Sequence, residues 1–119
     1  MAITQEPDLQ LGVEEGQDGT GGRIARVRCR GRLMHQNASR IKETVRPLIE
    51  RGGRVTIDLA EVNYLDSAGL GALVGLKVTS LKQEGCRLEL ENVSPWIQEM
   101  LRLTHLTEFF AGDGNVSQG

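Results

Sequence analysis

The chain has 119 residues and a formal net charge of −2, and 39% of its residues are hydrophobic. It contains only one Trp, one Tyr and two Phe, so few rings are available on which single-stranded nucleic acid could stack. The slightly negative charge gives no overall attraction to nucleic acid or to anionic membranes. The length suits one domain, whose core can hold together without a metal or a disulfide.

The two cysteines, Cys29 and Cys86, lie far apart and form no C-x-x-C spacing. We interpret them as buried thiols of a protein in a reducing cytosol, not as metal ligands. The longest uncharged apolar stretch, residues 67–76, is far short of the ~20 residues that cross a bilayer. We therefore expect a cytoplasmic protein without membrane insertion.

Both ends of the chain lack hydrophobic periodicity. Residues 1–8 and the Gly-rich residues 111–119 are predicted to be flexible tails on either side of one domain at 9–110. Residues 16–22 include four glycines and predict a hairpin loop after a first strand.

Alternating apolar and polar residues predict the strands. Residues 25–33 alternate apolar side chains with arginines, which indicates one buried face and one exposed arginine row. Residues 55–59 and 87–91 alternate in the same way, and a short strand at 108–110 is expected to close the sheet. Four glutamates are expected on neighbouring strands as ion-pair partners of the arginine row: Glu14, Glu15, Glu89 and Glu91.

Three helices are predicted between these strands. The first covers residues 36–51, with Asn37 as its cap and Pro47 bending its last turns. The second covers residues 67–84. The third begins with Ser94 as cap and Pro95 at the first helical position. The order predicts an α/β fold, a mixed β-sheet of four to five strands with three or so helices packed mainly on one face.

The turn into the second helix is the candidate functional site. Either Asp66 or Ser67 can cap this helix, since both offer a short side-chain oxygen. Residues 68–76 carry no charge on any face, and charge is expected to return at Lys77. An uncharged helix start beside a surface loop is typical of a docking surface for a partner protein. Phosphorylation of the Ser67 hydroxyl would place charge on that surface and disable docking without unfolding the helix.

These segments resemble a known family. Residues 55–59 and 66–71 resemble the signature of STAS domains, in particular the bacterial anti-sigma factor antagonists. The resemblance extends to residues 31–33 and 92–106. It implies a STAS-like fold, no cofactor, no metal and no enzymatic activity.

The resemblance also implies a mechanism. A partner anti-sigma factor, itself a serine kinase, would phosphorylate Ser67, and a phosphatase would reset the switch. The unphosphorylated protein would bind that kinase and release the sigma factor for transcription. The implied partner-binding residues are the following: Leu33, Met34, Asp66, Ser67, Ala68, Gly69 and Leu70.

One position departs from the family pattern. The family often has Gly-x-Leu-Asp after its second strand, whereas this chain has Gly31-Arg32-Leu33-Met34. A second function therefore stays open, that of a non-phosphorylated STAS scaffold or an accessory subunit of a transporter or signalling complex.

Two enzymatic alternatives have weaker support. Ser67 lacks the Gly-x-Ser-x-Gly elbow of serine hydrolases, and no acid is placed to orient the only candidate bases, His35 and His105. The glycines at 69, 71 and 75 miss the dinucleotide-binding spacing by one residue.

Overall fold

Residues 8–111 and 116–118 of the computed structural model are described here. They form a single five-stranded mixed sheet with helices packed against it, as the sequence predicts. The elements in chain order are β1 (Leu9–Gln17), β2 (Arg23–Leu33), α1 (Ala38–Arg51), β3 (Gly53–Leu65), α2 (Ser67–Lys82), β4 (Cys86–Val93), α3 (Pro95–Leu103), α4 (Thr107–Ala111) and β5 (Val116–Gln118).

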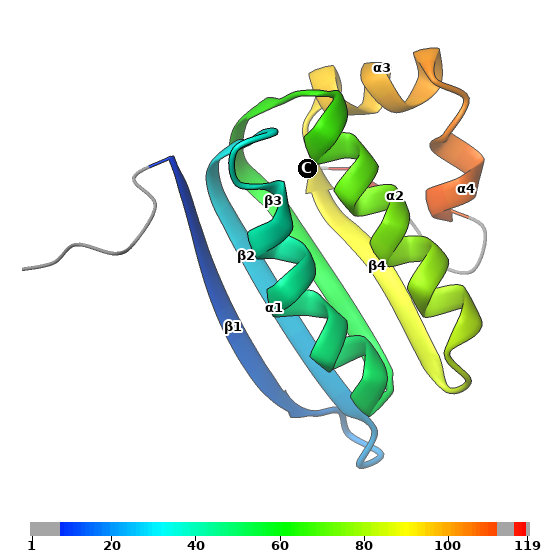
Figure 1. Ribbon diagram of the computed structural model, residues 1–119. Coiled ribbons are helices and arrows are strands. Elements are labelled where there is room, and N and C mark those ends of the chain that lie inside the picture. The colour runs from blue at the N-terminus through cyan, green and yellow to red at the C-terminus, as the bar shows by residue number, and fades with distance from the viewer. Residues whose placement is uncertain (1–7, 112–115, 119) are drawn as a thin grey trace, which may run out of the picture.

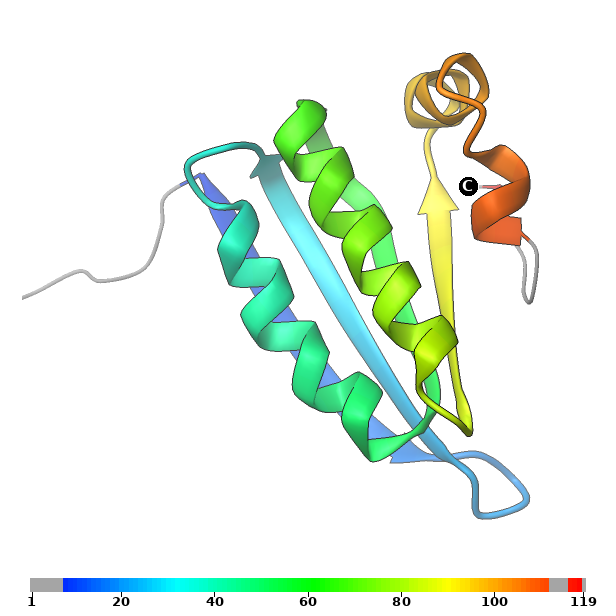
Figure 2. The same ribbon diagram turned by 45° about the vertical axis from the view of Figure 1, so that its right-hand side comes forward.

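The strands lie in the order β1-β2-β3-β4-β5, with β1 antiparallel to β2 and all other neighbours parallel. Helices α1 and α2 connect successive parallel strands in one direction across the sheet. Since such crossovers are right-handed, both helices lie on the same face (Figure 1). Helices α3 and α4 instead lie beside β4, at the side of the sheet away from β1 (Figure 2).

The core lies between the sheet and α1 and α2. Inward side chains of the strands meet apolar side chains of both helices, and the cluster is almost wholly aliphatic. One charged residue is also buried there. Lys77 of α2 is 1% exposed, and its Nζ donates to the backbone oxygen of Leu88 in β4 at 3.0 Å.

The opposite face of the sheet carries the arginine row of β2. Arg26 forms ion pairs with Asp58 of β3 and Glu91 of β4, and Arg28 lies 3.7 Å from Glu14 of β1. The expected pairing of this row with neighbouring glutamates is therefore right for Glu14 and Glu91 and wrong for Glu15 and Glu89. Further ion pairs join Arg30 to Glu61, Glu15 to Arg23 and Arg51, and Glu89 to Arg54 and Arg87.

The end of the chain differs from the sequence prediction. The strand expected at 108–110 is wrong, because these residues lie in α4. Phe110 donates its amide to the Leu106 oxygen at 3.1 Å, and Leu106, Phe109 and Phe110 all pack on the core. Their spacing of three and four residues is helical. The tail expected at residues 111–119 is not a tail throughout, since Ala111 ends α4 and Val116–Gln118 pairs with β4. Of the tail expected at residues 1–8, only Asp8 is described, and residues 112–115 and 119 also lie outside the described residues.

Two predicted helix caps are right in position, but neither side chain forms the capping hydrogen bond. Asn37 precedes α1, yet its side chain makes no cap hydrogen bond; instead it accepts from the Met34 amide and donates to the Arg32 oxygen, which fixes the loop after β2. The Ser94 hydroxyl does not cap α3 either. Helix α1 continues through Pro47 to Arg51.

Candidate protein-docking site

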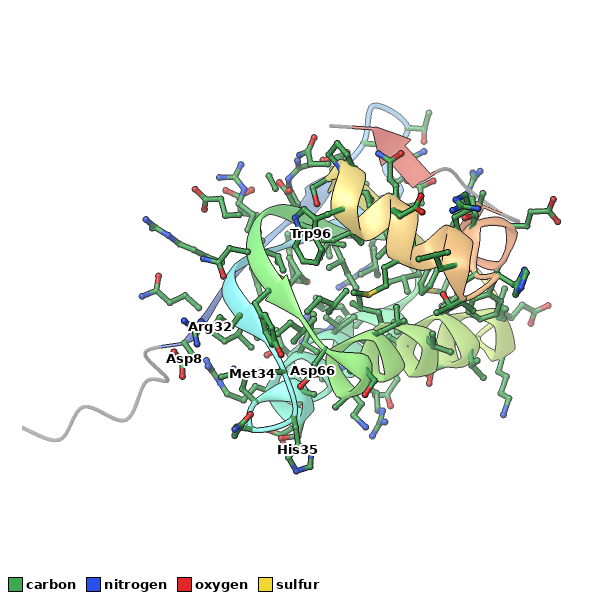
Figure 3. The ribbon with its side chains drawn as sticks, turned by 90° about the horizontal axis from the view of Figure 1, so that it is seen from above. Asp8, Arg32, Met34, His35, Asp66 and Trp96 are labelled. Atoms are coloured by element: carbon green, nitrogen blue, oxygen red, sulfur yellow. The ribbon has the colours of Figure 1, made fainter. Side chains whose placement is uncertain are left out.

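The turn from β3 into α2 lies at the carboxyl end of the parallel strands, and Figure 3 looks onto this end. Asp66 is the N-cap of α2. Its backbone is extended, with φ −101° and ψ −176°, and its Oδ1 accepts from the Gly69 amide at 2.8 Å. Either Asp66 or Ser67 could have filled this role by sequence, and the structure assigns it to Asp66.

Asp66 also ties this turn to the loop after β2. Its Oδ2 accepts from the His35 amide at 3.0 Å, and its own amide donates to the Leu33 oxygen at 3.3 Å. The hydrogen bonds from Gly69 and His35 stabilise the charged carboxylate and lower the pKa of Asp66. The carboxylate therefore holds two loops of the same surface in a fixed relative position.

Gly69 allows α2 to approach the end of β2 very closely. A Cβ added at Gly69 would lie 2.3 Å from the Leu33 oxygen and 2.8 Å from the Leu65 side chain. No side chain fits into that space, so the glycine is a packing requirement. Gly69 is itself buried, which makes it a residue that shapes the docking surface without presenting a side chain to it.

Ser67 is the first residue of α2, and its side chain is exposed. Within residues 8–111 and 116–118, no hydrogen bond of its hydroxyl is found. Because Asp66 already caps the helix, the described part of the fold makes no use of this hydroxyl. The hydroxyl is therefore accessible to a modifying enzyme or to a partner.

The predicted partner-binding residues separate into two groups. Ser67 is exposed, and Ala68 and Met34 are partly exposed, so these three can contact a partner. Leu33 is wholly buried and Leu70 is 9% exposed, so their side chains belong to the core. The contribution of Leu33, Gly69 and Leu70 to partner binding stays a prediction. Because all three are buried, they would act by positioning the exposed residues and not through side-chain contact.

The uncharged outer surface of α2 is longer than the sequence predicts. Charge is expected to return at Lys77, yet that residue points into the core. The outer face instead continues with Val78, 37% exposed, and Leu81, 54% exposed. We define the α2 stripe as the outward residues at helical spacing: Ser67, Gly71, Val74, Val78 and Leu81.

Two aromatic residues near this end of the sheet were missed by sequence reasoning. Tyr64 at the end of β3 is 48% exposed, and Trp96 in the first turn of α3 is 40% exposed. The carboxyl ends of parallel strands lie at the same edge, so both residues lie at the end of the sheet that also carries Ser67. The sequence did offer a signal for them: Tyr64 precedes Leu65 at the end of one alternating strand, and Trp96 follows Pro95 just after another.

Among residues 8–111 and 116–118, no three His, Cys, Asp or Glu residues are grouped so as to hold a metal ion. His105 lies in the turn between α3 and α4, where Thr107 and Glu108 are its neighbours. No helix within these ranges is long and apolar enough to span a bilayer.

Comparison with known proteins defines the class. The family model described as "Mlab, STAS domain" matches residues 18–111. The fold just described, with its βαβαβ core and the capped turn at Asp66, lies in the matched region. The chain belongs to the STAS family.

Particular relatives are similar over most of the chain. The anti-sigma-B factor antagonist of Bacillus subtilis strain 168 is 36% identical over 81 residues, which cover 68% of this chain and 71% of that protein. A crystal structure of an anti-sigma factor antagonist from Mycobacterium paratuberculosis has a TM-score of 0.71 at 21% identity, covering 92% of this chain and 88% of that one. A sulfate transporter family protein from Wolinella succinogenes has a TM-score of 0.67 at 21% identity, covering 79% and 75% of the two chains.

Proposed function

We propose that this chain is an anti-sigma factor antagonist, a protein-binding regulator of transcription. It binds an anti-sigma factor serine kinase when Ser67 is unmodified, and phosphorylation of Ser67 ends the binding. A phosphatase then restores the binding form. The observation that carries this proposal is that Ser67 is exposed, with a hydroxyl that no described residue uses, at the start of an uncharged helical surface.

Similarity to named antagonists supports the general activity. The relative from Bacillus subtilis is 36% identical over a stretch that covers most of both chains. The α2 stripe supports binding through this face, because a helix on the outside of a domain normally carries polar residues there. Here the stripe ends in Leu81, which is more than half exposed.

The electrostatics of the turn support a switch by phosphate. A phosphoserine carries about −1.5 to −2 charges at neutral pH. The Asp66 carboxylate is one residue away and already accepts a hydrogen bond from the Gly69 amide. That amide is therefore not free to bind a phosphate on Ser67. The phosphate would stay on the surface, where the helix dipole tolerates it and a partner that covers the stripe does not.

Met34 supports a second candidate function. Its side chain is partly exposed in the loop that Asp66 holds against α2, so it adds apolar surface where the family often has a carboxylate. An additional apolar side chain on this surface suits a permanent partner as well as a kinase. The alternative is therefore a non-phosphorylated STAS scaffold or accessory subunit of a transporter or signalling complex.

Intact-mass measurement separates the two candidates. The purified chain is incubated with Mg-ATP and the anti-sigma factor kinase encoded in the same genome. We expect one added phosphate on the wild type and on Ser39→Ala, which removes another exposed helix-start serine, and none on Ser67→Ala. Phosphate at another residue, or none with a kinase that binds the chain, would exclude the phosphorylation switch and favour the scaffold.

Binding measurements test the effect of the charge. We expect Ser67→Asp to keep the circular dichroism and melting temperature of the wild type, because Asp66 remains the cap. Its affinity for the kinase, measured by surface plasmon resonance, should fall by at least tenfold, whereas Ser67→Ala should bind. Equal binding by all three proteins would contradict docking over Ser67.

A further inference from the structure

The outer edge of β1 is unpaired within the described residues. In the sheet order, β1 is the first strand and pairs only with β2. From Gly12 to Gln17 every residue of β1 is exposed, including Val13 at 44%. An exposed strand edge offers a row of backbone donors and acceptors to another chain.

The hydrogen-bond pattern tells which residues face that edge. The Arg32 amide donates to the Asp8 oxygen at 2.6 Å, so this pair is a hydrogen-bonded one. Such pairs alternate along an antiparallel ladder. Even-numbered residues of β1 therefore direct their amides and carbonyls to β2, and odd-numbered residues direct theirs outward. The Leu9 oxygen agrees with this pattern, since it accepts from the Arg40 side chain of α1 at 2.6 Å.

The edge is complementary to itself. Two antiparallel copies of β1 centred on Val13 bring Val13 opposite Val13 and Leu11 opposite Glu15, so that odd-numbered residues meet odd-numbered residues. Glu14 then lies opposite Gly12, and no two like charges face each other. If the two strands were instead centred on Glu14, Glu14 of one copy would lie opposite Glu14 of the other, which is unfavourable.

The neighbouring side chains do not block this pairing. Glu15 is drawn toward Arg51 of α1, with N–O distances of 2.9 and 3.0 Å, so part of its charge is neutralised. Strand edges that avoid association commonly carry charged side chains, especially Lys, or Pro or a covering segment. The segment Leu9–Gln17 contains neither Lys nor Pro, and its two charged residues, Glu14 and Glu15, form ion pairs with arginines of the same chain.

We infer that β1 is the contact surface of a symmetric homodimer, in which two copies join their sheets through antiparallel β1 strands centred on Val13. The Arg40–Leu9 contact limits the new hydrogen bonds to the middle of the strand, from Leu11 to Glu15. The partner is a second copy of this chain, and the α2 stripe stays free on both copies, because α1 lies between α2 and the β1 edge (Figure 1).

Sedimentation equilibrium of the whole chain tests the dimer. We expect the mass to approach twice the monomer mass as concentration rises. Val13→Lys should raise the dissociation constant by about tenfold or more, because two cations would meet on the two-fold axis. Val13→Pro should abolish dimerisation and still fold, since the amide it removes faces outward and not toward β2. Val78→Lys, the same change on α2, should leave the dimer unchanged.

Disulfide cross-linking tests the register. Residues that face each other in a hydrogen-bonded pair have Cα atoms ~5.5 Å apart, which a disulfide can span. Val13→Cys should therefore cross-link two copies under oxidation, and Gly12→Cys should not. A wild type that stays monomeric up to millimolar concentration would overturn the dimer. A dimer unaffected by Val13→Lys, or cross-linked at residue 12 instead of 13, would overturn this interface.

Discussion

Ser67 and Gly69 lie two residues apart in one turn, yet they differ in how tightly the surrounding structure restricts their side chains. The Gly69 position has no room for a side chain, because the Leu33 oxygen lies where a Cβ would stand. Ser67 is exposed and its hydroxyl is not used by the described structure. A substitution at Gly69 should therefore act through stability, and one at Ser67 through binding.

Two glycines of α2 give a matched pair of stability predictions. Gly69→Ala should lower the free energy of unfolding by about 1–3 kcal/mol, because α2 must move away from the end of β2. Gly71→Ala should raise it by up to about 1 kcal/mol, because a Cβ there meets nothing within 4 Å and alanine is the better helix former. Urea unfolding followed by circular dichroism measures both. Equal effects of the two changes would contradict the close approach at Gly69.

At the scale of the element, α2 has no hydrophilic face. Its inner side packs on the sheet, Lys77 is drawn into the core, and the α2 stripe leaves apolar side chains in solvent. Such a helix is stable only because the sheet covers one side of it. Leaving the outer side of α2 in solvent costs little folding free energy, and a partner can cover this side.

Substitution in the C-terminal half of α2 tests whether the stripe is a binding surface along its whole length. Leu81→Lys should change the free energy of unfolding by no more than about 0.5 kcal/mol, because the side chain is 54% exposed. Its affinity for the anti-sigma factor kinase, measured by surface plasmon resonance, should nevertheless fall. Leu103→Lys makes the same change on α3, where the side chain is 63% exposed, and should leave the affinity unchanged. An unchanged affinity in Leu81→Lys would confine docking to the start of α2.

At the scale of the whole molecule, Asp58 connects three strands. Its carboxylate accepts from Arg26 of β2 at 3.1 Å, from Asn92 of β4 at 3.0 Å and from the Ala60 amide of its own strand at 2.9 Å. Burial on its own raises the pKa of Asp58, but the hydrogen bonds from Ala60, Asn92 and Arg26 outweigh it and lower the pKa. The open face of the sheet is thereby cross-linked at its centre.

This lowered pKa predicts how stability depends on pH. A carboxyl whose pKa is lower in the folded state stabilises the fold above the unfolded pKa of about 3.9, and that contribution is lost as pH falls through the folded value. Stability should therefore drop in acid below about pH 4. Asp58→Asn should cost about 1–3 kcal/mol at neutral pH and reduce the acid-dependent part of the drop. Thermal melts of both proteins between neutral and acidic pH measure this, and parallel curves would contradict it.

The sequence determined the sheet and the two covering helices, because alternating and helical periodicities each reflect one partner surface. It located the turn at residues 66 and 67 as well, since the residue types that can cap a helix are few, but it left the cap open between Asp66 and Ser67. Local sequence patterns were less informative where a polar residue can either cap a helix or bind a neighbouring loop. Asn37 and Ser94 are good caps by type, yet Asn37 bonds the loop after β2, and the final strand expected at 108–110 is the helix α4.

Only the tertiary structure decided which residues of the site can meet a partner. The family resemblance implies that Leu33, Gly69 and Leu70 bind a partner, but the packing of α2 against the end of β2 buries all three residues. By sequence, Lys77 is expected to end the uncharged surface of α2. In the structure its side chain is buried and donates to the Leu88 oxygen, and the exposed apolar surface continues to Leu81. A sequence pattern states what each side chain prefers, whereas burial depends on distances between segments far apart in the chain, and these are set when the sheet and helices pack together.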